Sequence, residues 1–393
     1  DYQFDAPVTA WDESSKKAHW RKRPDKSQPF FSVFNIETTH ESQVWVREKQ
    51  PLLVNPKDVM VPPFYPDDSV SRKTMARFLS NVMVMDQQVG AIINQLKEDG
   101  LYEESIIFFY SDHGDGMPFV KRELSQRGLK VPLLIKAPNL PKGKVDNQLI
   151  SFVDFGPTVL SLAGVTLPKT LHGQPFLGGQ KAKAKRQYIY AARDRMDSEY
   201  DRVRAVSDGR FKYIRNYMPE KSYYQNIRYR LQNPLMLHML ALKNAGKLNE
   251  TQMKWFRPTK ALEELFDTQN DPHEFNNLAN NPTYKDKLVE LRGKHLAWIK
   301  QYGDLGAKPE LEMIKEWWNG QDKPPVTEKS NVAIANGTVQ LSCPTAGASI
   351  GFRKNSKETW QVYTKPFSLN NGDSLYVMSH RIGFVPTEIR LKN

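Results

Sequence analysis

The sequence of 393 residues contains a single cysteine, Cys343, which excludes both an intramolecular disulfide and a metal site built from several cysteines. No apolar run approaches the roughly 20 residues that a membrane-spanning helix needs. The sequence also lacks a glycine-rich phosphate loop, a Gly-x-Ser-x-Gly elbow and the helical motif of zinc proteases. The common ways of supplying a nucleophile are therefore missing.

The composition is that of a globular protein, with 39% apolar and 25% charged residues and no low-complexity block. The formal net charge of +12 favours an anionic partner such as a sulfated or phosphorylated polymer, although a basic surface can also serve solubility alone. The positive charges are spread along the chain instead of gathering in one basic arm. We therefore expect no nucleic acid as a partner.

An apolar run over residues 105–111 ends at an acid, an imidazole and two glycines. Because its apolar residues are continuous, this run predicts a fully buried strand of a parallel sheet. Ligands of such sheets bind at the carboxyl ends of the strands, which is where Asp112 and His113 lie. Both could bind a divalent cation. Alternatively, Asp112 caps the next segment and His113 is a hydrogen-bonded core residue.

Two further places in the sequence could contribute to the same site. Residues 29–36 predict a second buried strand, and His40 follows it as a possible general acid or anion donor. Lys121 and Arg122 lie in a loop, where either cation could neutralise an oxyanion. In each case the alternative is an ordinary solvated loop residue.

The hydrophobic patterns predict an α/β protein with a mainly parallel sheet flanked by helices, followed by smaller β-rich parts. Helical spacing predicts a helix over residues 70–99. Alternating strands with short turns predict an antiparallel subdomain, and short strands near the end predict a small β-sandwich. The expected order is an α/β domain (1–184), the antiparallel sheet with helices (185–303), a linker (304–328) and the β-sandwich (329–393).

Several segments, in their order along the chain, resemble the sulfatase family of the alkaline phosphatase superfamily. The matching segments are Pro29-Phe30-Phe31…Thr39-His40, Met85-Asp86-Gln87-Gln88-Val89-Gly90, Ser111-Asp112-His113-Gly114, Lys121, Val131-Pro132-Leu133-Leu134-Ile135, Val153-Asp154-Phe155-Gly156-Pro157-Thr158, Asp208-Gly209-Arg210-Phe211-Lys212-Tyr213 and Leu265-Phe266-Asp267…Asn277-Leu278. The resemblance covers about residues 29–300. Residues 329–393 are loosely similar to the chitobiase-type β modules of some bacterial glycan enzymes.

The resemblance implies an alkaline-phosphatase-like fold and hydrolysis of a sulfate ester on a sulfated carbohydrate. Asp112 and His113 would then bind a divalent cation, usually Ca²⁺. Lys121, with Arg122 beside it, would bind the sulfate, and His40 would assist the leaving-group oxygen. The nucleophile of this family is a formylglycine, and we expect a periplasmic or secreted protein.

The sequence departs from the family pattern in two respects. It contains no Cys/Ser-x-Pro/Ala-x-Arg motif, from which formylglycine is made, and it lacks the N-terminal pair of metal-binding acids. We therefore expect an N-terminally incomplete chain that is inactive alone and binds calcium weakly.

Two alternative functions remain open at this point. One is a phosphodiesterase or phosphonate hydrolase of the same superfamily, many of which use two metal ions and more histidines than the eight present here. The other is a non-catalytic glycan-binding protein, whose affinity would survive replacement of His40 or Asp112.

Overall fold

The structure is a computed structural model that describes residues 4–370 and 372–392. Contacts divide the chain into two compact units. One is Asn35–Asp304, and the other combines the chain up to Phe34 with the chain from Leu305 onward. The N-terminal segment thus groups with the C-terminal β-rich part, whereas the predicted boundaries placed it in the first domain.

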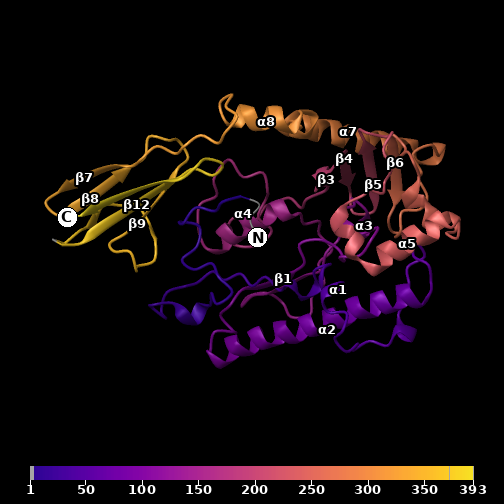
Figure 1. The fold of residues 1–393 in the computed structure, drawn as a ribbon, viewed down its shortest axis with the longest axis horizontal. Coiled ribbons are helices and arrows are strands. Elements are labelled where there is room, and N and C mark those ends of the chain that lie inside the picture. Colours follow the sequence, from indigo (N-terminus) through magenta and orange to yellow (C-terminus); the bar gives the residue numbers. More distant parts are fainter. Residues whose placement is uncertain (1–3, 371, 393) are drawn as a thin grey trace. The chain divides into compact units, whose positions relative to one another are not determined.

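A long helix, α2 (Ser69–Glu98), supports the segment that carries His40 (Figure 1). Asp68 caps its first turn by accepting hydrogen bonds from the backbone N–H groups of Val70 and Ser71. The predicted helix over residues 70–99 is confirmed. Its buried side packs against the 3-10 turn η2 (Glu37–Thr39), the short helix α1 (Gln43–Val46) and helix α5 (Pro234–Asn244).

The strand before Asp112 is β1 (Ile107–Tyr110), and its environment differs from the prediction. Among the described residues it pairs with β2 (Leu133–Lys136) alone, in antiparallel register with Phe108 opposite Ile135. The strand is half-buried, because Phe155 and Phe176 cover Phe108 while Tyr110 stays partly exposed. A continuous apolar run therefore did not mean a strand buried on both faces.

The prediction of a mainly parallel sheet is likewise wrong for the described residues, whose named strands all pair antiparallel. Residues 29–36, predicted as a strand, are extended but pair with no strand of the described chain. The α/β class itself is confirmed, since the unit combines helices with β-sheets.

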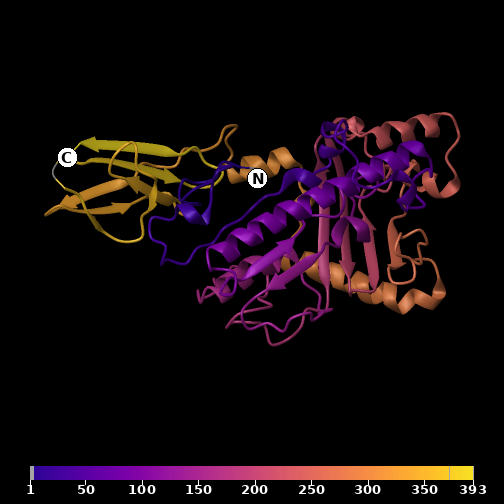
Figure 2. The same cartoon turned by 90° about the horizontal axis from the view of Figure 1, so that it is seen from below.

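The larger sheet of this unit is antiparallel, as predicted for the region after residue 185. Its strand order follows the sequence: β3 (Ile189–Met196), β4 (Glu199–Ser207), β5 (Phe211–Asn216) and β6 (Glu263–Asp267). Helix α7 (Lys285–Tyr302) packs on one face through Leu288 and Leu291 (Figures 1 and 2). A second cluster on this sheet joins Val203 and Phe266 to Leu124 and Leu129, which follow Lys121 in the sequence. The sheet therefore supports the loop on which the site depends.

Three further helices complete this unit: α3 (Gln126–Leu129), α4 (Phe155–Leu162) and α6 (Glu250–Met253).

The second unit contains helix α8 (Glu310–Trp317) and two antiparallel sheets that share one buried apolar cluster. One sheet has the order β10-β9-β12-β13 and the other β11-β8-β7. The strands are β7 (Asn331–Ala335), β8 (Thr338–Ser342), β9 (Ser349–Arg353), β10 (Gln361–Val362), β11 (Phe367–Ser368), β12 (Ser374–His380) and β13 (Thr387–Lys392). Across the described residues of both units, no helix is long and apolar enough to span a membrane.

Candidate active site

His40 and Lys121, which are 81 residues apart in the sequence, lie in contact. The Nζ atom of Lys121 is 3.1 Å from Nε2 of His40. A protonated lysine has only donors, so Nε2 of His40 accepts this hydrogen bond and the imidazole is neutral in this arrangement. The other ring nitrogen, Nδ1, is 2.9 Å from the hydroxyl oxygen of Ser42. The structure thus brings together a cation and an imidazole that could both face one anion.

Glu41 is the residue that holds this pair in place. Its buried carboxylate lies 3.0 Å from Nζ of Lys121 and accepts two hydrogen bonds, at 2.8 and 3.1 Å, from the guanidinium group of Arg122. Burial alone would raise the pKa of Glu41, but the hydrogen bonds and charges of the two cations outweigh it and lower that pKa. The carboxylate of Glu41 thus holds both cations, and the ammonium group of Lys121 is the one that lies beside His40.

Arg122 was predicted to bind substrate, and the structure gives its guanidinium group protein partners instead. Besides the two hydrogen bonds to Glu41, its Nε lies 3.6 Å from a carboxylate oxygen of Asp197. A bidentate Arg–carboxylate pair fixes the fork of the guanidinium. Arg122 therefore acts here mainly on Glu41, while Lys121 is the cation beside His40.

Glycines permit the close approach of the segments that carry these residues. A Cβ atom on Gly116 would lie 2.9 Å from the backbone of Glu41, and one on Gly114 would lie 1.7 Å from the carbonyl oxygen of Arg127. Any side chain would push these segments apart. Gly116 thus lets its segment lie against Glu41, and Gly114 lets the chain after His113 lie against Arg127.

Asp112 and His113 directly follow β1, as expected, but they do not form a complete metal site. The carboxylate of Asp112 is 85% exposed and lies 3.8 Å from Nε2 of His113. Nδ1 of His113 is 2.7 Å from the carbonyl oxygen of Gly114. Within residues 4–370 and 372–392, no group of three or more His, Cys, Asp or Glu side chains could hold a metal ion. Since calcium takes six to eight ligands, this donor pair does not fit the ion by itself.

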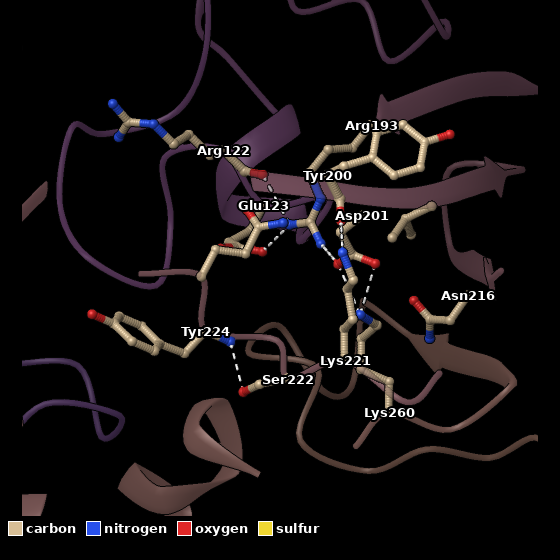
Figure 3. Close-up of polar contacts among 12 residues, drawn as sticks. Arg122, Glu123, Arg193, Tyr200, Asp201, Asn216, Lys221, Ser222, Tyr224 and Lys260 are labelled. Carbon is tan, nitrogen blue, oxygen red and sulfur yellow. Dashed lines mark hydrogen bonds and ion pairs between the residues drawn. The ribbon is translucent and has the colours of Figure 1, made fainter. Parts of the chain in front are cut away.

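A buried ionic network fixes the loop immediately after Lys121 (Figure 3). Arg193, from β3, donates hydrogen bonds to the carboxylate of Glu123 at 2.5 Å and to the backbone carbonyl of Arg122 at 3.1 Å. Its other terminal nitrogen binds Asp201 of β4, whose two carboxylate oxygens each lie 2.8 Å from Nζ of Lys260. The antiparallel sheet therefore determines where Lys121 lies.

A second buried pair holds the same loop two residues further on. Nζ of Lys212 donates to the backbone carbonyl of Leu124 at 2.7 Å and forms an ion pair with Glu274. Glu274 in turn accepts a hydrogen bond of 2.7 Å from the backbone N–H of Gln126. Arg122 has a positive φ of 75°, a conformation that costs free energy for a residue other than glycine. The contacts on both sides of the loop hold the backbone in this conformation.

Glu41, Glu123, Arg193 and Asp201 were not predicted from the sequence. Glu41 offered one clue, because it adjoins His40. The other three have no local signature, because Glu123 meets Arg193 across 70 positions, and Arg193 and Asp201 lie on different strands.

The pKa of His40 is lowered by burial of its ring and, second, by the positive charge of Lys121, while Glu41 opposes these effects. A bound anion would favour the protonated ring, so the pKa of His40 should be higher in the complex than in the free protein. Affinity for inorganic sulfate should then rise as the pH falls from 8 to 6. Isothermal titration at several pH values tests this, with proton uptake on binding as the second readout. His40→Gln should remove most of the pH dependence, and a pH-independent wild type would contradict the prediction.

Comparisons with known proteins identify relatives of this chain. The family pattern described as Sulfatase matches residues 12–165, and the one described as N-sulphoglucosamine sulphohydrolase, C-terminal, matches residues 114–234. An "Ulvan-active sulfatase" of Formosa agariphila is 45% identical over 99% of this chain and 72% of its own length. The "N-sulphoglucosamine sulphohydrolase" of Homo sapiens is 27% identical, over 71% of this chain and 59% of its own length.

Among solved structures, a phosphonate monoester hydrolase from Silicibacter pomeroyi is similar with a TM-score of 0.44 and 18% identity, over 84% of this chain and 57% of that one. The chain thus spans between about half and three quarters of the length of these proteins. The 45% identity to the Formosa protein extends over nearly the whole chain and most of the relative. This chain therefore belongs to the sulfatase family.

Proposed function

We propose that this chain provides the sulfate-binding side of a sulfatase active site that removes sulfate from a sulfated carbohydrate. The observation that carries the proposal is the contact between Lys121 and His40, held by the buried carboxylate of Glu41. The ammonium group of Lys121 beside an imidazole suits a singly charged sulfate ester. The net charge of +12 for the whole chain would also favour a polyanionic substrate.

In this proposal Lys121 donates a hydrogen bond to a sulfate oxygen and balances the charge that develops there. His40 takes up a proton when the anion binds and then donates it to the leaving sugar oxygen. Glu41 and Arg122 hold the two groups in position. The family's nucleophile, a formylglycine, has no source motif in these 393 residues, so we expect no turnover of an aryl sulfate by the chain alone.

Calcium, the cation expected for such a site, would need oxygen donors beyond Asp112 and His113. A bound cation would polarise the sulfate. We predict that the chain alone binds calcium with an affinity no tighter than roughly millimolar, which is the weak end of protein calcium sites. Isothermal titration with calcium chloride measures this, and Asp112→Asn should change the result little. Micromolar binding that Asp112→Asn abolishes would contradict this prediction.

A sulfated polysaccharide, met in the periplasm or outside the cell, is the proposed substrate class. The name of the Formosa relative makes ulvan the first polysaccharide to test. The test compares the binding of ulvan oligosaccharides before and after chemical desulfation. We expect the chain to bind only the sulfated form. Equal binding of both would favour a glycan-binding protein, and preference for a phosphate monoester would favour a phosphohydrolase.

A further inference from the structure

Tyr229 lies beside His40 without being part of the polar site. It belongs to the 3-10 turn η5 (Arg228–Gln232), and its ring centroid is 6.3 Å from that of His40. On another side the ring meets Trp45 of α1 nearly at right angles, with centroids 5.6 Å apart. Tyr229 nevertheless remains 38% exposed. An aromatic ring is thus presented to solvent next to the contact between Lys121 and His40.

The backbone that carries Tyr229 is held on both sides by buried residues. Ile227 and Arg230 are almost completely buried, and the backbone N–H of Arg230 bonds to the carbonyl of Ile227 at 3.0 Å. The guanidinium group of Arg230 lies over the ring of Trp255, 4.8 Å from its centroid, and donates to the carbonyl of Gln225 at 3.2 Å. The position of Tyr229 is therefore fixed before any ligand arrives, which lowers the entropic cost of binding.

The exposed ring and hydroxyl group of Tyr229 are suited to contact with a sugar. Within the described part of the chain its hydroxyl group has no hydrogen-bond partner, so it can bond to a ligand. Tyrosine combines an apolar ring face with a polar tip. A sugar ring has the matching surface, with C–H groups on its faces and hydroxyl groups around its edge. Lys121 and His40 can hold a sulfate group, but neither offers a surface for the sugar that bears it.

We propose that Tyr229 contacts the sugar ring whose sulfate group lies at Lys121 and His40, and that it contributes to selection of the carbohydrate. This inference rests on the proposed function and extends it from the sulfate to the sugar. Trp45 packs against the ring of Tyr229, and η5 carries its backbone.

The test compares two probes, ulvan oligosaccharides and inorganic sulfate, by isothermal titration. Tyr229→Ala should weaken binding of the oligosaccharide roughly tenfold, as expected for loss of an aromatic contact, and should leave binding of sulfate within about twofold. Tyr229→Phe should keep most of the affinity. Tyr302→Ala removes a similarly exposed tyrosine, 45% against 38%, that contacts His172 instead of His40, and this variant should bind both probes like the wild type.

The outcomes separate this inference from the proposed function. Unchanged oligosaccharide binding by Tyr229→Ala, or an equal loss for both probes, overturns the inference alone. A wild type that binds sulfate but no oligosaccharide also overturns it and leaves the sulfate site standing. A wild type that binds neither probe contradicts the proposed function, and the inference fails with it. Melting curves of each variant verify that it is folded.

Discussion

Asp201→Asn is expected to lower the free energy of unfolding by about 3–5 kcal/mol, the usual cost of leaving a buried charge without its partner. Asp201 is completely buried and is shared by Arg193 and Lys260, whose side chains are also buried. Arg230 adds a third cation, 3.5 Å from Glu123. Three cations already face two carboxylates, so loss of one carboxylate doubles the excess positive charge.

Deprotonation of Lys260 can reduce the destabilisation caused by Asp201→Asn. Burial already lowers its pKa, against the opposing effect of Asp201, and without Asp201 it should lose its proton more easily. When the pKa of a lysine is lower in the folded than in the unfolded state, the protein becomes less stable as the pH falls below the pKa of the unfolded state. The deficit of Asp201→Asn should therefore be smaller near pH 9.5 than at pH 7.

Urea unfolding followed by circular dichroism measures both effects. Asp112→Asn is the matched control, because it makes the same chemical change at an exposed carboxylate and should stay within about 0.5 kcal/mol of the wild type. A loss below about 1 kcal/mol in Asp201→Asn at pH 7 would mean that the network does not hold the loop after Lys121.

Lys121→Gln is expected to reduce the affinity for ulvan oligosaccharides by roughly 10- to 150-fold, equivalent to about 1.5–3 kcal/mol for a hydrogen bond to a charged group. The substitution keeps a donor of similar length but removes the charge that faces His40. Glu41 would then be paired with Arg122 alone, and the cation that contacts His40 would be lost.

The control for this variant is Lys130→Gln, which removes the same charge from an exposed position at the end of α3. It should change the affinity less than twofold at 0.15 M salt, because charges on the surface are screened. Isothermal titration of both variants with ulvan oligosaccharides measures the two affinities. An equal loss in the two variants would show that only the overall charge matters and would contradict the role proposed for Lys121.

Patterns that depend on neighbouring residues were predicted well from the sequence. The spacing of apolar residues located α2, and the alternating segments after residue 185 located β3 to β5. The abrupt end of the apolar run correctly placed Asp112 and His113 just after a strand. The antiparallel pairing of β1 with β2 was not predictable in this way, because a run of apolar residues does not specify which strand pairs with it.

The site itself depends on partners that are distant in the sequence. The residue types and their spacing identified His40 and Lys121 only as separate candidate positions. The resemblance to sulfatases implied that they belong to one site. Their contact across 81 positions now gives that proposal a geometry. The buried pairs of Glu41 with Arg122 and of Glu123 with Arg193 follow from tertiary packing alone, since no spacing connects their members.

The most direct test of the account is a crystal structure of the chain with a sulfated ulvan disaccharide. The account predicts a sulfate oxygen within hydrogen-bonding distance of Nζ of Lys121, with His40 beside the oxygen that links sulfate to sugar and Tyr229 against the sugar ring. A disaccharide bound elsewhere, with Lys121 still paired only to His40 and Glu41, would contradict the central claim.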